Sequence, residues 1–362
     1  MKKISFLIIC LLLCSCTKTL TVFKENVIGS IPTSSKLTLT MVGDALVHSP
    51  IYKSAYKNGK YDFSDLFSEV ESEFINSDLL YYNAETIIGG EELGYSGYPR
   101  FNTPHEFAEQ MIYMGFNVVS RANNHSLDLG EAGIINACNF WNKYPHVLTN
   151  GSACTKDERD IIKVHEKNGI RYALLSYTTL TNGFKPKKDY YVNIYSDEQV
   201  YQDVMKIKHD ADVIIVAMHW GNEYKSMPNN EQKRIASYLS SLGVNIVIGT
   251  HPHVIEPIEW IDGTLVIYSL GNFISSQSYE NDYARRIGLL VNIDIIKTET
   301  ESEKRITLVN LNTKLLYMYS NYNTYKIIPF TKLNNNILYN YNIYKDKYSK
   351  IVSYYISNII VN

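Results

Sequence analysis

The chain has 362 residues, of which 45% are hydrophobic and 20% are charged, as in ordinary globular proteins. This length suits one large domain or two domains of average size. The formal net charge of −2 argues against a nucleic-acid partner, because nucleic-acid-binding proteins carry a strongly basic face.

The N-terminal residues have the order of an export signal. Met1-Lys2-Lys3 is charged, and the apolar stretch from Ile4 to Leu13 is too short to span a bilayer. The residues Leu13-Cys14-Ser15-Cys16 resemble the processing site of a bacterial lipoprotein, with Cys16 as the lipidated residue. A plain secretory signal cleaved nearby is the alternative. We predict a lipoprotein signal peptide at 1–15 and a polar tether at 16–36, and therefore a membrane-anchored protein of the cell envelope.

Short apolar runs alternate with amphipathic helical patterns after the tether, which is typical of an α/β protein. Strands are predicted at 37–42, 79–82, 117–120, 213–217 and 244–248, and helices at 64–75, 103–114, 130–144 and 230–242. Ser64 and Thr103 are the expected N-caps, with Pro104 at the first helical position. The patterns at 161–177 and 254–270 predict two hairpins, the second around Asp262-Gly263.

The C-terminal part predicts further strands at 287–296 and 306–317, then a loop and a helix from about residue 336. Two cysteines remain outside the signal region. Cys138 is expected to be a buried thiol on the apolar face of the helix at 130–144, which also carries Ile134, Ile135 and Trp141. A disulfide with Cys154 is the alternative, since the sequence does not give the distance between the two residues.

Five predicted strands are followed by residue types that bind metals. His251-Pro252-His253 comes just after the run at 244–248, and in an extended segment residues i and i+2 point the same way. Two unrelated histidines in a polar loop are the alternative. The other strands lead to Asp44, Glu85, Asn124-His125 and His219. Because strand ends gather at one edge of an open sheet, we expect a metal site with oxygen and nitrogen ligands, which suits Mn, Zn or Fe.

These residues stand in six motifs in the same chain order as in a known family. The motifs are Gly43-Asp44, Asn83-Ala84-Glu85, Asn123-Asn124-His125-Ser126-Leu127-Asp128, His219-Trp220-Gly221-Asn222-Glu223, His251-Pro252-His253 and Gly271-Asn272-Phe273. Over about residues 37–277 the chain resembles the CapA family of poly-γ-glutamate capsule synthesis proteins. The resemblance implies a metallophosphatase-like, four-layer α/β/β/α sandwich, and residues 278–362 would be a C-terminal extension of strands plus a helix.

The resemblance also implies roles for the site residues, with one or two divalent ions per chain. Asp44 and His253 would hold the first metal, Glu85 would bridge, and His125 would be the general acid. The second metal would be held by Asn124, His219 and His251. The residues expected around this centre are His48, Arg100, Asn123, Asp128, Glu223 and Asn272. Of these, Asp128, Glu223 and Asn272 would orient imidazoles, and Arg100 would pair with a substrate carboxylate or phosphate.

One departure from the superfamily pattern leaves the activity open. Its first motif is Asp-x-His, and here Leu46 stands at the histidine position, with His48 two residues further on. One reading is a capsule-biosynthesis hydrolase that cleaves an amide or phosphoester. The other is a non-catalytic component of a capsule export or anchoring complex that binds polymer carboxylates. In both readings the partners are an anionic polymer such as poly-γ-glutamate, the membrane, and other capsule synthesis proteins.

Overall fold

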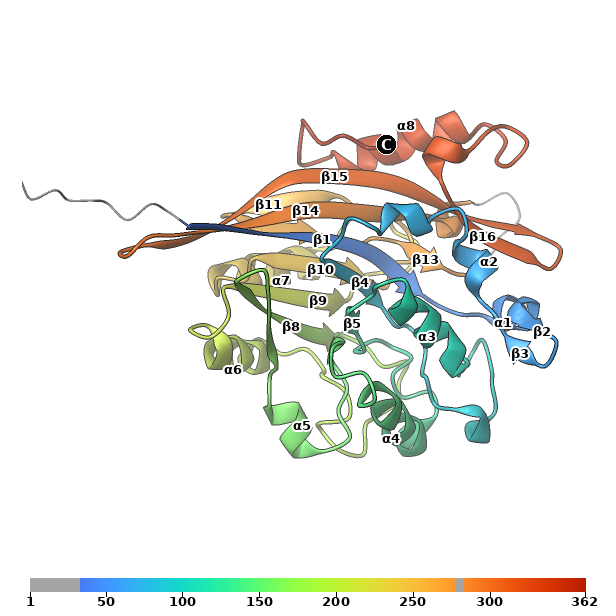
Figure 1. Ribbon diagram of the computed structural model, residues 1–362, viewed down its shortest axis with the longest axis horizontal. Coiled ribbons are helices and arrows are strands. Elements are labelled where there is room, and N and C mark those ends of the chain that lie inside the picture. Colours follow the sequence, from blue (N-terminus) through green and yellow to red (C-terminus); the bar gives the residue numbers. More distant parts are fainter. Residues whose placement is uncertain (1–32, 278–282) are drawn as a thin grey trace, which may run out of the picture.

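The computed structural model describes residues 33–277 and 283–362. Two β-sheets pack face to face, and helices cover the outer face of each sheet (Figure 1). This is the α/β/β/α layering that the family resemblance implies. The predicted signal peptide, Cys16 and the tether as far as residue 32 lie outside the described residues. Within the described ranges, no helix is long and apolar enough to cross a membrane.

The larger sheet has eight strands in the order β16-β15-β14-β1-β4-β5-β6, with β13 also paired to β1. Its parallel part consists of β1 (Thr33–Ala45), β4 (Leu79–Asn83), β5 (Val118–Ser120), β6 (Leu148–Asn150) and β13 (Asn272–Ile274). Its antiparallel part consists of β14 (Ile287–Glu299), β15 (Lys304–Asn321) and β16 (Thr324–Pro329). The segment after residue 277 thus supplies strands to the same sheet as β1.

The smaller sheet has six strands in the order β11-β12-β10-β9-β8-β7. Its strands are β7 (Val164–Lys167), β8 (Ile170–Thr178), β9 (Val213–His219), β10 (Ile246–Thr250), β11 (Ile258–Ile261) and β12 (Thr264–Ile267). The four central strands are parallel, and both predicted hairpins form its antiparallel edges. At the β11–β12 turn, Asp262 and Gly263 have φ values of 47° and 88°, the left-handed pair that such a hairpin requires.

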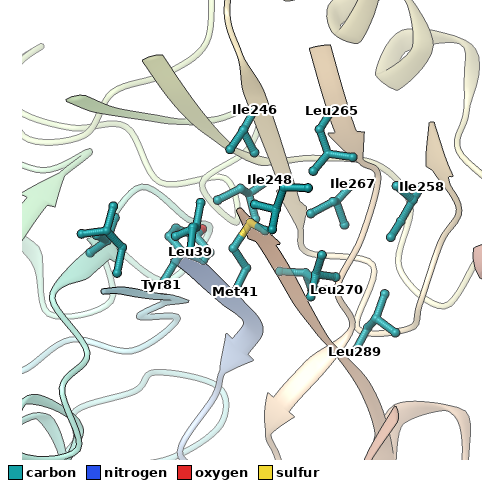
Figure 2. Packing of buried hydrophobic residues seen from close by; sticks show 14 of the residues in the cluster. Leu39, Met41, Tyr81, Ile246, Ile248, Ile258, Leu265, Ile267, Leu270 and Leu289 are labelled. Carbon is teal, nitrogen blue, oxygen red and sulfur yellow. The ribbon is translucent and has the colours of Figure 1, made fainter. Parts of the chain in front are cut away.

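Alternating side chains on the strands build separate cores on the two faces of each sheet. On β9, Val213, Ile215 and Ala217 face the other sheet, whereas Ile214 and Val216 face helices. Figure 2 shows the inter-sheet core, in which Leu39, Met41 and Tyr81 of the larger sheet approach residues of β10 and β12. Strands buried on both faces are nearly continuous apolar runs, which explains why β9 and β10 are recognisable from the sequence.

Helices cover both outer faces. The larger sheet is covered by α1 (Ser49–Ala55), α2 (Ser64–Phe67), α3 (His105–Tyr113) and α4 (Gly130–Trp141). The smaller sheet is covered by α6 (Asp197–Ile207) and α7 (Asn230–Ser241). Two small strands, β2 (Tyr56–Lys57) and β3 (Lys60–Tyr61), follow α1, and α5 (Lys156–Asp160) follows β6. The C-terminal α8 (Tyr341–Val352) lies along β15 and extends the inter-sheet core (Figure 1).

The expected helix at 64–75 is wrong. The helix ends at Phe67, and only a short 3₁₀ turn, Glu71–Glu73, follows. Lys332 donates to the backbone oxygen of Glu69 at 2.7 Å, and Phe74 packs against Phe116 and Phe273. Most apolar residues of this segment are therefore buried by tertiary contacts, without a continuous helix.

Several smaller expectations also need correction. Ser64 is the first residue of α2 and makes no cap, and Pro104 occupies the N-cap of α3. The Thr103 hydroxyl is instead paired with that of Thr86 at 2.6 Å. Ile135 is 39% exposed, beside the buried stripe of α4. Residues 33–36, placed in the tether, belong to β1. The strands β6 and β16 and the helices α5 and α6 were not predicted.

Candidate metal centre

The ligand-type residues lie at the carboxyl ends of strands from both sheets. Asp44 is the last residue but one of β1, and Glu85 follows β4. His219 ends β9, and His251 and His253 follow β10. The strands β1, β9 and β10 run in the same direction (Figure 1), so their ends meet at one rim of the sandwich. This is the placement predicted from the sequence.

Close backbone packing allows β1 to reach the site. A Cβ atom at Gly43 would lie 1.8 Å from the backbone oxygen of Gly271, so a side chain at this position would push the two segments apart. With glycine there, Asp44 donates its backbone N–H to Gly271 at 3.0 Å and is paired in register with Asn272. The glycine of the first motif therefore positions Asp44.

The six predicted ligands lie close together and are buried at this rim of the sandwich. Two groups of potential ligand atoms, each within 4.8 Å of one another, are formed by Asp44, Glu85 and His219 and by Glu85, His251 and His253. Glu85 Oε1 lies 3.5 Å from His219 Nε2 and 3.7 Å from His253 Nε2. Asn124 Oδ1 lies 2.9 Å from His219 Nε2. Glu85 is the only member common to both groups, which is the position expected of a bridging ligand.

The grouping differs from the one implied by the family resemblance. That resemblance places Asp44 with His253 and places His219 with His251. In the structure Asp44 Oδ2 does lie 3.3 Å from His253 Nδ1, but Asp44 also groups with His219, and His251 groups with His253. The assignment of each ligand to a particular ion stays a prediction.

The two histidines of the His-Pro-His segment reach the site by an unexpected backbone path. The extended conformation predicted for this segment is wrong, because His251 and His253 have φ values of 98° and 58°. The imidazole centroids are nevertheless 5.9 Å apart. Left-handed conformations are unfavourable for residues with a Cβ atom and are found mainly at functional sites.

The donor chemistry fits a divalent cation. Both carboxylate oxygens of Glu85 and the Nδ1 atom of His251 are buried and accept or donate no hydrogen bond within the described part of the chain. Burial, followed by the charge of Asp44, raises the pKa of Glu85 well above its usual value. Burial lowers the pKa of His219 well below its usual value and that of His251 to about 4. Neutral imidazoles and carboxylates that lack a compensating charge are the groups that a metal ion would satisfy.

Neighbouring polar groups fix the orientation of the candidate ligands. Asn272 Oδ1 lies 3.0 Å from His253 Nδ1, as predicted for an orienting residue. Two orienting residues were not selected from the sequence. Asn83 Nδ2 donates to Asp44 Oδ1 at 2.8 Å, and Thr250 Oγ1 lies 3.1 Å from His219 Nδ1. Asn83 is the last residue of β4 and Thr250 is the last residue of β10. A polar residue at the end of a strand is the sequence signal that could have identified them.

The loop after β5 carries His125 and its partners. Asp128 Oδ2 lies 2.8 Å from His125 Nδ1 and also accepts the backbone N–H of Phe101 at 2.6 Å. Asn123 closes the loop, since its Oδ1 accepts the N–H of His125 at 3.1 Å. Asp128 therefore orients His125 rather than one of the metal-group imidazoles.

A cavity of about 410 Å³ opens over the centre. It is lined by Leu46, Tyr98, Pro99, Arg100, Asn124, His125, Asn182, Phe184, Glu223, Tyr224, His253 and Gln277. Arg100 is at its rim, with the guanidinium 5.3 Å from the Phe184 ring centroid. Glu223, a predicted imidazole partner, is exposed and lines the cavity, and its orienting role stays a prediction. The aromatic lining from Tyr98, Phe184 and Tyr224 was not anticipated.

His48 is near the centre but outside both ligand groups. Its Nδ1 lies 2.9 Å from the backbone oxygen of Leu46 and 3.3 Å from the backbone nitrogen of Ser276. Its ring packs edge-on against Phe101, and burial lowers its pKa to about 4. His48 therefore connects the β1 loop to the segment after β13.

Comparison with known proteins gives the family of this chain. The family model for the bacterial capsule synthesis protein PGA_cap matches residues 38–277. The chain belongs to the PGA_cap family. The matched range includes every predicted metal ligand and ends where the motif-bearing sequence was predicted to end.

Similar proteins are found among curated sequences and solved structures. The PGA biosynthesis protein CapA of Bacillus subtilis (strain 168) is 30% identical over 67% of this chain and 64% of its own length. The capsule biosynthesis protein CapA of Bacillus anthracis is 25% identical over 68% of this chain and 61% of its own length. The chain thus spans less than two thirds of either relative. A putative 5′-nucleotidase structure from Staphylococcus aureus aligns with a TM-score of 0.46 and 13% identity, over 86% of this chain and 58% of that one.

Proposed function

We propose that this PGA_cap family protein is an envelope-anchored, metal-dependent hydrolase that cleaves an amide or phosphoester during capsule biosynthesis. Its substrate would be an anionic polymer such as poly-γ-glutamate. The observation that carries the proposal is the position of Glu85, which is shared by two groups of buried ligand atoms beneath an open cavity. A buried carboxylate without a donor is costly unless a cation or proton compensates it.

In such a reaction, one set of residues would bind the metal and another would transfer the proton. A divalent ion of the Mn, Zn or Fe type, one or two per chain, would activate water and polarise the scissile group. The ion would be held by Asp44, Glu85, Asn124, His219, His251 and His253. His125 lines the cavity and would protonate the leaving group, and Asp128 holds the ring in place through Nδ1.

Arg100 is the proposed anchor for the anionic substrate. It is exposed at the cavity rim, where its guanidinium can form paired hydrogen bonds with a carboxylate or phosphate. Phe184 and Tyr98, which also line the cavity, provide apolar walls for the intervening chain of a polymer. Together they support a substrate that carries charged groups at intervals along a chain with methylene segments.

The test is hydrolysis of poly-γ-glutamate and of a generic phosphodiester, with Mn or Zn added. His125→Ala should retain its metal and lose turnover by about 10²–10⁴-fold, the usual contribution of a general acid. His146→Ala is the matched control, because His146 is exposed, precedes β6, and belongs neither to the ligand groups nor to the cavity lining. Undiminished turnover in His125→Ala would contradict the acid role. No turnover by the metal-loaded parent on either substrate would contradict the hydrolase proposal.

One observation favours the second candidate, a non-catalytic polymer-binding component of a capsule export or anchoring complex. Leu46, at the position of the superfamily histidine, is 2% exposed and lines the cavity, so one site has one ligand fewer. If the protein is a binder, capsule display should survive His125→Ala and fail with Glu85→Ala. If it is a hydrolase, both variants should lose display.

The anchoring part of the proposal depends on Cys16. The charged and apolar residues before it, followed by Leu13-Cys14-Ser15-Cys16, support a lipid attached at this position. Cys16→Ser should release the protein from membranes or block its processing, as measured by fractionation and by electrophoretic mobility. A variant that matures and fractionates with membranes like the parent would refute the lipid anchor.

A further inference from the structure

We propose that Cys138 and Cys154 form a disulfide that fastens α4 to the segment between β6 and α5. Cys138 is fully buried in α4, and Cys154 is half-buried just before α5. Their sulfur atoms lie within 4.8 Å of each other and of a carboxylate oxygen of Glu158. Both thiols are free in the structure, so the two side chains must rotate to reach the covalent S–S distance of about 2.05 Å.

The two cysteines share one small apolar cluster, separate from the metal centre. Cys138 packs there with Ala122, Leu127 and Ile134, and Cys154 lies at its margin. Ala122 and Leu127 belong to the loop after β5 that carries Asn124 and His125. A covalent link across this cluster would therefore support the loop from behind.

A guanidinium distinguishes this pair from a metal site. Arg121 Nη2 donates to Cys138 Sγ at 3.5 Å and to the backbone oxygen of Ser152 at 2.8 Å. A cation bound between the two sulfur atoms would be repelled by this charge. The Arg121 contacts also hold the two segments together before any bond forms.

Glu158 slows the oxidation of Cys154, the more accessible of the two cysteines. Its Oε2 accepts hydrogen bonds from Cys154 Sγ at 2.9 Å and from the Cys154 backbone N–H at 3.0 Å. Burial, then Glu158, raises the pKa of Cys154 to about 12. Since the thiolate is the attacking species, pairing at neutral pH is slow and depends on the Glu158 contact.

The reaction requires a disulfide as the oxidant. The Cys154 thiolate attacks one sulfur of a small-molecule disulfide and forms a mixed disulfide, and one thiol leaves. The Cys138 thiolate then attacks the Cys154 sulfur, and the second thiol leaves. Two protein thiols are oxidised, the reagent is reduced to two thiols, and the two protons go to solvent or to the leaving thiolates.

Peptide mapping of the full chain tests the proposal directly. The native protein is incubated with oxidised glutathione, alkylated and digested with trypsin without reduction. Cleavage after Arg121, Lys143 and Lys156 places the cysteines on separate peptides, 122–143 and 144–156, so their cross-link has a unique mass. We expect the linked peptides and a melting temperature higher by about 5 °C, which reduction reverses. Two alkylated cysteines after native oxidation would overturn the proposal.

Two variants distinguish the disulfide from a zinc site at the same residues. Cys154→Ser retains a donor for Glu158 but should show neither the linked peptides nor the melting shift. Glu158→Gln should form the link at least about tenfold faster, because it frees the thiolate. An unchanged rate in Glu158→Gln, or stoichiometric zinc that is lost in Cys154→Ser, would contradict the proposed pairing.

Discussion

At His251 and His253 the residue type and the backbone geometry give different information. Two histidines after a buried strand identify candidate ligands, and both side chains do enter the centre. Their left-handed φ values of 98° and 58° do not follow from any local signal, since most residues with a Cβ atom avoid this region. Asp44 helps to stabilise the conformation of His251, because its carboxylate accepts the His251 backbone N–H at 3.2 Å.

Asn272 offers a residue-scale test of ligand orientation. Its Oδ1 lies 3.0 Å from His253 Nδ1, and loss of such a partner typically weakens metal binding by about 10–100-fold. We expect this reduction in Mn or Zn affinity for Asn272→Ala, measured by equilibrium dialysis. Asn136→Ala is the control, because its amide contacts Gly89 and Glu92 away from the centre. Equal affinity in Asn272→Ala and the parent would contradict the orienting role.

At the scale of elements, the sequence predicts those whose side chains are buried on a regular face. β9 and β10 are continuous apolar runs, and α7 begins with a recognisable capping pattern. The helix expected at 64–75 is too long because 3₁₀ and turn conformations can bury the same spacing of apolar residues. β16, rich in Tyr, Lys and Ile, gains its pairing from β15 across a turn, and composition alone does not show this.

Helix α6 was missed although its signal is present. Ser196 caps it by accepting from the Gln199 N–H, and Val200, Val204 and Ile207 form its buried stripe. An N-cap residue and apolar side chains three or four residues apart are the usual sequence signals of a helix. The sequence of α6 therefore contains enough information to predict this helix.

The N-terminus of α7 allows an element-scale prediction. The Asn229 side chain accepts from the Gln232 N–H at 2.9 Å, and the Gln232 side chain accepts from the Asn229 N–H at 2.9 Å. Asn229→Ala removes one half of this capping box and should lower the free energy of unfolding by about 0.5–2 kcal/mol. Urea unfolding measures the change. Asn229→Asp should retain most of the stability, and an equal loss in both variants would argue against capping.

At the scale of the whole molecule, a buried charge cluster joins the two sheets. Asp212, just before β9, receives hydrogen bonds from Arg171 of β8 and from Lys304 of β15, and Lys297 of β14 lies 3.3 Å away. Strands of both sheets thus meet at one carboxylate whose side chain is 0% exposed. Part of the cluster lies outside residues 38–277, which the PGA_cap family model matches, because Lys297 and Lys304 come from the C-terminal strands β14 and β15.

This cluster predicts a dependence of stability on pH. Burial alone would raise the pKa of Asp212, but the hydrogen bonds from Lys304 and Arg171 outweigh it and hold the pKa below its usual value. A lowered folded-state pKa contributes stability above the unfolded value of about 3.9, and this stability is lost as the pH falls below it. Asp212→Asn should unfold more easily at pH 7, by about 1–3 kcal/mol, and lose less stability on acidification.

Thermal unfolding from pH 7 to pH 2 measures the effect, with Asp210→Asn as an exposed control. A parent and an Asp212→Asn variant with parallel stability profiles across this range would contradict the contribution of Asp212.

The central claim is that this fold gathers Glu85 and the surrounding histidines to bind metal. The most direct measurement is metal content by elemental analysis after loading with Mn or Zn and exhaustive dialysis. The account predicts one or two ions per parent chain, a loss of about tenfold or more in affinity for both His251→Ala and His253→Ala, and parent-like content for His146→Ala. No retained metal in the parent, or equal content in the parent and both site variants, would contradict it.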